Sequence, residues 1–187
     1  MAQIKLILLD FDGTLVDTRD ANAYAYIEAL GEVGITLSRE EYLEQYFGVR
    51  CMEFLKMVGI EDDEQIQRLR RRKIELYPNY FSSVRLNSAL WQWCRMMRHM
   101  GAKVWIASTG HIDNITNVMR YLSLESEIDG IISGDDVARP KPSPDCFLRA
   151  MEIEGVSPSE TIIFEDSHVG LEAAKSSGAS YVRVTDF

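Results

Sequence analysis

Two aspartates stand two residues apart directly after an apolar run, in the stretch ILLDFDGTLVDT at residues 7–18. Side chains two residues apart in an extended chain point to the same side, so Asp10 and Asp12 can act on one group. A carboxylate held at a strand end can attack phosphorus and form an aspartyl phosphate. A second carboxylate can give a proton to the leaving oxygen and then take one from water. The pair therefore predicts a nucleophile, Asp10, and a general acid and base, Asp12.

Polar residues also follow three later apolar runs. Ser108 ends one run, Lys141 lies in the loop ARPKPSPD, and Glu165 and Asp166 end another. Ligands of parallel α/β sheets bind beyond the carboxyl ends of the strands, where these groups would meet. Carboxylates gathered at one point repel each other unless a cation is present, and an all-oxygen cluster suits Mg²⁺. The expected metal ligands are Asp10, Asp12, Glu165 and Asp166.

The residues at this edge would neutralise the negative charge of a bound phosphoryl group on several sides, which is the main requirement of phosphoryl transfer. Lys141 would act as a point charge and the hydroxyl of Ser108 as a hydrogen-bond donor. We therefore expect both to be catalytic. In the loop after the second strand, the expected substrate-binding residues are Thr109, Gly110 and His111.

Five short apolar runs predict the strands that must position these residues. Most are apolar at consecutive positions, as is typical of strands covered on both faces of a parallel sheet. Segments with helical spacing alternate with them, which predicts a doubly wound, three-layer α/β core with a parallel sheet. The strands are expected at residues 4–10, 103–108, 130–133, 161–165 and 181–184, and the later helices at 86–97, 112–121, 143–154 and 168–177.

The first two predicted strands are separated by residues 11–102, although a crossover connection needs only about a dozen residues. This span has helical patterns at 18–33, 38–46, 51–58 and 62–77. Ser38 followed by Glu41 is a capping-box pattern at the start of the second helix. We therefore predict a helical cap domain at residues 17–84, inserted into a catalytic core formed by 1–16 and 85–187.

Four segments in order, DFDGTLVDT, WIAST, RPKPSPD and IIFEDSHVGLEAAKSSGA, resemble the motifs of the haloacid dehalogenase-like hydrolase superfamily. The resemblance spans nearly the whole chain and is greatest to the subgroup with a small helical cap, which includes phosphoglycolate phosphatase and β-phosphoglucomutase. It implies a Rossmann-like core, with Asp10 as nucleophile and Asp12 as acid and base. It also implies Mg²⁺ bound by Asp166, the Asp10 side chain and the Asp12 main-chain carbonyl. Asp12 favours phosphate chemistry over dehalogenation.

Some positions have two interpretations. Glu165 is either a metal ligand or a residue that orients Lys141 or a metal-bound water. Arg50 follows a Gly-x-x stretch where similar proteins have a substrate-specificity loop, and otherwise it is a surface arginine. The run RLRRRK at 68–73 is either a solvated helix face or, through Arg72 or Lys73, a contact for an anionic substrate.

The charge, hydrophobicity and cysteine content of the chain restrict the kinds of partner and the cellular location that we expect. The 187 residues include 29 acidic and 20 basic side chains, a net charge of −9, which argues against a nucleic acid or an acidic membrane as partner. No apolar run approaches the roughly 20 residues of a membrane span. Three cysteines without metal-ligand spacing indicate reduced thiols, and we expect a cytoplasmic monomer.

Three functions are compared. The first is a Mg²⁺-dependent phosphatase of a small phosphorylated metabolite. The second is a sugar phosphomutase, which the resemblance disfavours because β-phosphoglucomutase has a histidine where this chain has Asn22. The third is a non-enzymatic phosphorylation switch like a receiver domain, whose acidic pair and phosphate acceptor would come from different strands. The first is the function that we expect.

Overall fold

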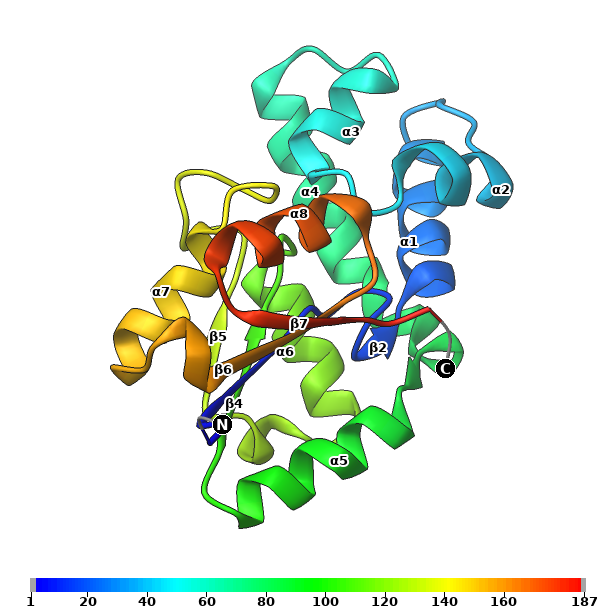
Figure 1. Ribbon diagram of the computed structural model, residues 1–187. Helices are drawn as coiled ribbons and strands as arrows, with labels where there is room; N and C mark the ends of the chain where they lie inside the picture. Colours follow the sequence, from blue (N-terminus) through cyan, green and yellow to red (C-terminus); the bar gives the residue numbers. More distant parts are fainter. Residues whose placement is uncertain (1–2, 186–187) are drawn as a thin grey trace. The chain divides into compact units, whose positions relative to one another are not determined.

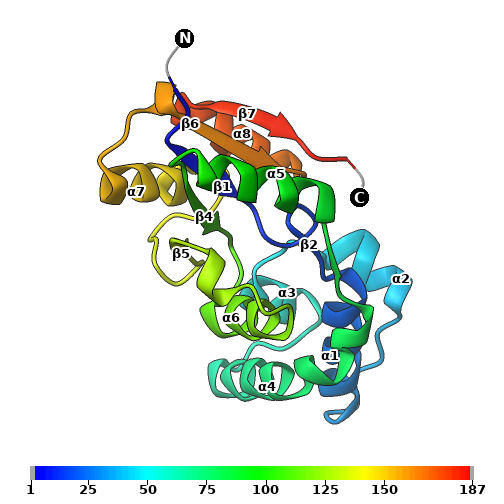
Figure 2. The same ribbon diagram turned by 90° about the horizontal axis from the view of Figure 1, so that it is seen from below.

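The computed structural model describes residues 3–185. Its main sheet has five parallel strands in the order β5-β4-β1-β6-β7 (Figures 1 and 2). All pairings within it are parallel, which confirms the predicted fold class. The predicted strands are all present, with ends that differ by up to two residues. They are β1 (Leu6–Leu9), β4 (Lys103–Ala107), β5 (Gly130–Ile132), β6 (Thr161–Glu165) and β7 (Ser180–Arg183).

The central strand β1 determines where the residues that follow it emerge from the sheet. Its four side chains are completely buried, and burial of each Leu or Ile contributes about 1.5–3 kcal/mol. The strand lies between β4 and β6, with Leu9 opposite Ile106 on one side and Phe164 on the other. The residues after these three strands therefore emerge at the same edge of the sheet.

Helices cover both faces of the sheet. On one face, α7 (Asp145–Glu154) and α8 (His168–Ser177) pack on inward residues such as Leu8 and Ile163. Because neighbouring residues of a strand point to opposite faces, Phe164 points to the other face. There it contacts Trp93 of α5 (Ser88–His99), with 5.2 Å between ring centres. Connecting elements are α6 (Ile112–Tyr121) between β4 and β5, and the short 3₁₀ turns η3 (Glu125–Glu127) and η4 (Pro158–Glu160).

The chain divides into two compact units, of which the first runs up to Asp17 and resumes at Leu86, and the second is Thr18–Arg85. Helices make up the second unit, and its core is aromatic: the Phe54 ring centre lies 4.8 Å from that of Tyr26 and 5.0 Å from that of Tyr46. That this unit acts as a cap stays a prediction. Its elements are α1 (Arg19–Gly31), α2 (Arg39–Glu41), the π-helical turn η1 (Tyr42–Tyr46), α3 (Cys51–Met57), α4 (Asp63–Leu76) and the 3₁₀ helix η2 (Tyr77–Ser83).

Local details differ from the sequence-based expectations. The expected capping residue is present, since the Ser38 side chain accepts a hydrogen bond from the Glu41 amide at 3.1 Å. The expectation of helix from Leu86 is wrong, because α5 begins at Ser88 and Leu86 belongs to a two-residue strand. This strand, β3 (Arg85–Leu86), pairs with β2 (Val16–Asp17). Both strands are too short to produce a detectable alternation of apolar and polar residues.

Candidate active site

A buried lysine joins two carboxylates at the carboxyl edge of the sheet. Lys141 donates from Nζ to Asp10 Oδ1 at 2.6 Å and to Glu165 Oε2 at 2.9 Å. The side chains of Lys141, Asp10 and Glu165 are 3%, 10% and 1% exposed. Ion pairs so shielded from water hold their partners in one arrangement far more firmly than surface pairs do. The structure thus brings together three residues that the sequence predicted to meet.

Asp10, Glu165 and Asp166 form an acidic cluster, in which each residue offers a carboxylate oxygen within 4.8 Å of the others. The cluster could hold a metal ion. Three carboxylates face one ammonium group, so their charge is only partly balanced by the protein. An all-oxygen donor set with excess negative charge fits a hard divalent cation such as Mg²⁺.

Electrostatic shifts agree with this imbalance. Burial raises the pKa of Asp10 well above its ordinary range, and the charges of Glu165 and Asp166 raise it further, against the opposing effect of Lys141. Burial likewise raises the pKa of Asp166. Burial alone would lower the pKa of Lys141, but Asp10 and Glu165 reverse the direction and raise it. The lysine therefore stays charged, and the two aspartates lack sufficient positive charge near them.

Glu165 is held on both of its oxygens. Oε2 accepts from Lys141, and Oε1 accepts from the Ser167 amide at 3.1 Å and from the Ser167 hydroxyl at 2.8 Å. Gly170, in the first turn of α8, leaves the space that this carboxylate fills, because an added Cβ there would lie 2.0 Å from Glu165 Cδ. The geometry favours the second interpretation of Glu165, as the residue that orients Lys141.

Gly13 and Thr14, which follow Asp12 in the sequence, fix the position of the Asp166 carboxylate. The Thr14 hydroxyl donates to Asp166 Oδ1 at 2.9 Å. Gly13 has a φ of +94°, and an added Cβ on it would lie 2.4 Å from Asp166 Oδ2. Glycine is therefore required at position 13 for two reasons, the backbone conformation and the close approach of the Asp166 carboxylate.

The carboxylate of Asp12 lies beside the loop after β4 and is not a member of the acidic cluster. An added Cβ on Gly110 would lie 3.4 Å from Asp12 Oδ2 and 3.2 Å from Ser108 Oγ, so both side chains flank this glycine. Ser108 Oγ accepts from the Gly110 amide at 3.0 Å. The metal and proton-transfer roles of Asp12 stay predictions.

Thr109 and Gly110 pack closely against the loop after β5. The Gly134 amide donates to the Gly110 carbonyl at 2.9 Å, and an added Cβ on Gly134 would lie 2.2 Å from the Thr109 carbonyl oxygen. His111, predicted to bind substrate, caps α6: its Nδ1 accepts from the Asp113 amide at 3.1 Å. Its Nε2 lies 3.5 Å from Asp135 Oδ2. These contacts fix the shape of the loop, and direct contact with substrate stays a prediction.

Arg50 and Lys73, the other predicted substrate residues, belong to the second unit. Arg50 directly precedes α3. Lys73 is 2% exposed, donates from Nζ to Asn22 Oδ1 at 2.7 Å and lies 3.7 Å from the ring centre of Tyr77. Its neighbour Arg72 instead forms an exposed ion pair with Glu32 at 2.7 Å. Contacts of Arg50 and Lys73 with substrate stay predictions.

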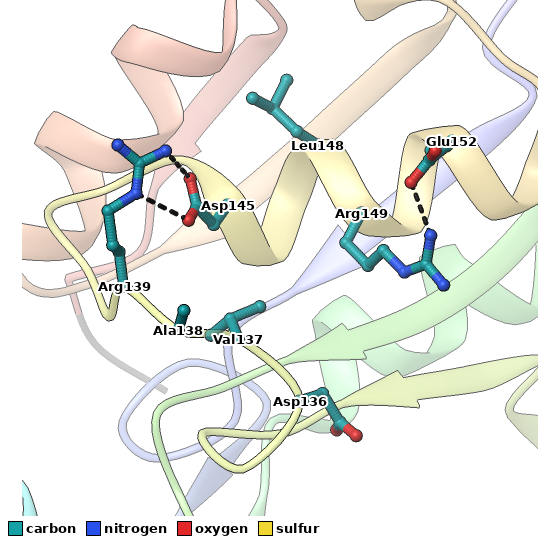
Figure 3. Close-up of a pocket in the computed structure, with 8 residues that line it drawn as sticks. All are labelled: Asp136, Val137, Ala138, Arg139, Asp145, Leu148, Arg149 and Glu152. Carbon is teal, nitrogen blue, oxygen red and sulfur yellow. Dashed lines mark hydrogen bonds and ion pairs between the residues drawn. The ribbon is translucent and has the colours of Figure 1, made fainter.

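A separate surface pocket of about 490 Å³ lies between the loop after β5 and α7 (Figure 3). Its arginines are already paired, Arg139 with both oxygens of Asp145 at 2.9 Å and Arg149 with Glu152 at 2.5 Å (Figure 3). A phosphorylated ligand would have to break one of these pairs, so the pocket is a poor candidate for a phosphate site. It is lined by Asp136, Val137, Ala138, Arg139, Asp145, Leu148, Arg149 and Glu152.

Sequence reasoning missed the residues that support the site. Thr14, Ser167 and Gly170 each contact a carboxylate of the acidic cluster. A local signal existed for Ser167, since Ser is a preferred N-cap and its side chain accepts from the Gly170 amide at 3.0 Å. Thr14 lies 152 residues from Asp166 along the chain, and no local pattern reports such a contact.

Within residues 3–185, no helix combines the length and the apolar character that crossing a bilayer would require.

Comparison with known proteins identifies the family. Residues 7–184 match the model described as haloacid dehalogenase-like hydrolase. A phosphorylated carbohydrates phosphatase of Thermotoga maritima is 28% identical over 178 residues, which cover 94% of this chain and 82% of the relative. Crystal structures of CbbY from Rhodobacter sphaeroides are similar in fold: the complex with phosphate has a TM-score of 0.89 at 27% identity, covering 99% of this chain and 88% of the other. The complex with xylulose-(1,5)bisphosphate has a TM-score of 0.88 at 26% identity, with the same coverage. The family model covers nearly the whole sequence, and the chain belongs to the haloacid dehalogenase-like hydrolase family.

Proposed function

We propose that this hydrolase, a phosphatase of the haloacid dehalogenase-like family, cleaves the phosphate ester of a small phosphorylated metabolite through an aspartyl phosphate on Asp10. The observation that carries the proposal is the buried carboxylate of Asp10, held by Lys141 at 2.6 Å within an acidic cluster that could hold a metal ion. Rigid placement of a nucleophile beside groups that can neutralise the charge of the transferred phosphoryl group is what phosphoryl transfer requires.

The reaction has two halves. In the first, a carboxylate oxygen of Asp10 attacks phosphorus, the bond from phosphorus to the ester oxygen breaks, and Asp12 gives its proton to that leaving oxygen. In the second, Asp12 takes a proton from water, whose oxygen attacks the phosphorus of the aspartyl phosphate. The bond from phosphorus to the Asp10 oxygen breaks, which releases inorganic phosphate and regenerates the Asp10 carboxylate. The location of the Asp12 carboxylate beside Ser108 and Gly110, in the loop after the strand that pairs with β1, supports these roles.

The proposed cofactor is Mg²⁺, bound by the side chains of Asp10 and Asp166 and by the main-chain carbonyl of Asp12. The ion would neutralise negative charge on the phosphoryl oxygens and on the two aspartates. Lys141 would supply further positive charge, and Glu165 keeps its ammonium group in place. Ser108 and the amides of the following loop are proposed to donate to the remaining phosphoryl oxygens.

A phosphorylated carbohydrate is the proposed substrate class. The names of two similar proteins support it, one being a phosphorylated carbohydrates phosphatase and the other having been crystallised with xylulose-(1,5)bisphosphate. Arg50, Lys73 and His111 are proposed to contribute to selection among such esters, because cationic and imidazole groups bind anionic sugars.

Hydrolysis is favoured over mutase chemistry by one position in α1. Asn22 is present where the mutase resemblance expects a histidine, and its amide oxygen accepts a hydrogen bond from Lys73 at 2.7 Å. A carboxamide cannot shuttle protons at neutral pH, whereas imidazole can. Water is therefore the proposed acceptor of the phosphoryl group.

The proposal is tested with Asp10→Asn and a panel of phosphorylated metabolites in the presence of Mg²⁺. Loss of phosphate release and of a hydroxylamine-trappable acyl phosphate is the expected result. Glu64→Gln is the matched control, because it removes one negative charge from an exposed position of α4. Phosphate release by Asp10→Asn at the wild-type rate would overturn the proposed function. Formation of an isomeric sugar phosphate in place of inorganic phosphate would replace hydrolysis with mutase chemistry.

A further inference from the structure

A buried asparagine holds the main chain of the loop that carries Asp10, Asp12 and Gly13. Asn87 is 5% exposed and directly precedes α5. Its main-chain amide donates to the Leu15 carbonyl at 2.8 Å, and its Nδ2 donates to the Thr14 carbonyl at 3.2 Å. Its Oδ1 accepts from the Leu90 amide at 3.1 Å. The residue thus joins two consecutive carbonyls of the loop to the first turn of α5.

Within this loop, Thr14 gives the acidic cluster a side-chain hydrogen bond. Its carbonyl is held by Asn87, while its hydroxyl holds Asp166 Oδ1 at 2.9 Å. The loop is also closed on itself, with the Gly13 amide donating to the Val16 carbonyl at 2.8 Å. A completely buried Thr14 in a closed loop has little freedom to adjust if its carbonyl loses a partner.

We infer that Asn87 is a positioning residue that fixes Thr14 and, through the Thr14 hydroxyl, orients the carboxylate of Asp166 for a divalent cation. The inference rests on the proposed function, which assigns Asp166 to that ion. Groups that orient metal ligands without touching the metal typically change metal affinity by about 10–100-fold when they are removed.

The two roles of Asn87, capping α5 and holding Thr14, can be separated chemically. Asn87→Asp keeps an acceptor for the Leu90 amide and keeps the main-chain bond to Leu15, so the cap survives. It loses the Nδ2 donor and places a carboxylate oxygen against the Thr14 carbonyl. Asn87→Ser is a second variant that caps the helix with a side chain too short to reach Thr14. Both variants should fold, and both should lose the contact with Thr14.

The experiment measures Mg²⁺ binding by titration calorimetry, together with the rise in Tm that Mg²⁺ produces in the resting enzyme. Asn87→Asp and Asn87→Ser should each weaken Mg²⁺ binding by about 10-fold or more. Thr14→Val should weaken it similarly, and Thr14→Ser, which retains the hydroxyl, should restore it. Because the two residues act in series, Asn87→Asp combined with Thr14→Val should bind no more weakly than Thr14→Val alone.

Asp62→Ala is the matched control, because it removes the N-cap of α4, where Asp62 accepts from the Gln65 amide at 2.7 Å. It should lower Tm and leave Mg²⁺ affinity unchanged. Wild-type Mg²⁺ affinity in both Asn87 variants, or effects of Asn87→Asp and Thr14→Val that multiply, would overturn the inference and leave the proposed function intact. Absence of Mg²⁺ binding by the wild-type enzyme would instead overturn the metal assignment and this inference with it.

Discussion

The Nζ atom of Lys141 lies 2.6 Å from Oδ1 of Asp10, although 131 residues separate them in the sequence. The contact exists because Asp10 directly follows the central strand and Lys141 lies in the loop after an outer strand of the same parallel sheet. Lys141 also contacts Glu165 at 2.9 Å, so one ammonium group fixes the ends of two neighbouring strands. The proposed chemistry therefore depends on the same three buried charges that hold these strand ends together.

Lys141→Met should therefore lower both activity and stability. Removing the ammonium group leaves two buried carboxylates unpaired, and breaking a buried ion pair in this way typically costs about 3–5 kcal/mol. Urea unfolding should show a fall of that size in the free energy of unfolding. Lys175→Met, at an exposed position of α8, is the control and should change it little. Equal stability of the two variants would contradict the structural role of Lys141.

Gly170→Ala should impair catalysis, although alanine is the better helix former. The added Cβ would lie 2.0 Å from Glu165 Cδ, so Glu165 must shift and take Lys141 with it. A displacement near 1 Å at a reacting group can reduce kcat by about 100-fold. Gly31→Ala, at the end of α1 with no atom within 4 Å of its added Cβ, should keep kcat and stabilise the protein by about 0.4–1 kcal/mol. If both variants keep wild-type kcat, the packing of Gly170 against Glu165 has no catalytic role.

The edge of the sheet that carries the candidate site was predictable from the sequence because its signals are local. Each of the polar groups follows a short apolar run, and parallel strands bring their carboxyl ends to one edge. The strand at Thr161–Glu165 and the helices Ile112–Tyr121 and His168–Ser177 agree with the predicted bounds. Contacts across the fold, such as Thr14 with Asp166, have no local signal and required the structure.

One error has a specific cause. Leu86 extends the apolar period of α5 backwards, although Asn87 is the N-cap at which the helix begins. In the basic run at 68–73 only some side chains point inward, since Ile66, Leu69, Lys73 and Leu76 form the buried stripe of α4. Lys73 therefore lies on the apolar side of the helix, where the faces of Tyr26 and Tyr77 replace water around its charge.

Stability should fall in acid partly through Glu160. Hydrogen bonds from Lys5 and from Ser157 lower the pKa of Glu160 to about 2. A carboxylate whose pKa is lowered by folding stabilises the protein above its ordinary pKa, and this contribution is lost as the pH falls through the lowered value. At pH 6, Glu160→Gln should therefore have a lower free energy of unfolding than the wild type. Between about pH 4.5 and pH 2, its free energy of unfolding should fall less than that of the wild type. Urea unfolding at several pH values would measure both differences. Glu64→Gln should follow the wild-type profile. Parallel profiles for wild type and Glu160→Gln would exclude the contribution of Glu160.

Comparing Gly13→Ala with Gly34→Ala separates two effects of an added Cβ, strain in the backbone and displacement of the Asp166 carboxylate. Both glycines have positive φ, +94° and +80°, so alanine at either position should cost about 1–2 kcal/mol of stability. The added Cβ of Gly13 would also lie 2.4 Å from Asp166 Oδ2, whereas that of Gly34 has no atom within 4 Å. Only Gly13→Ala should therefore weaken Mg²⁺ binding, by about 10–100-fold in calorimetric titration, and lower kcat. Similar Mg²⁺ affinities in the two variants would mean that Asp166 can move away without loss, and its assignment as a metal ligand would then fail.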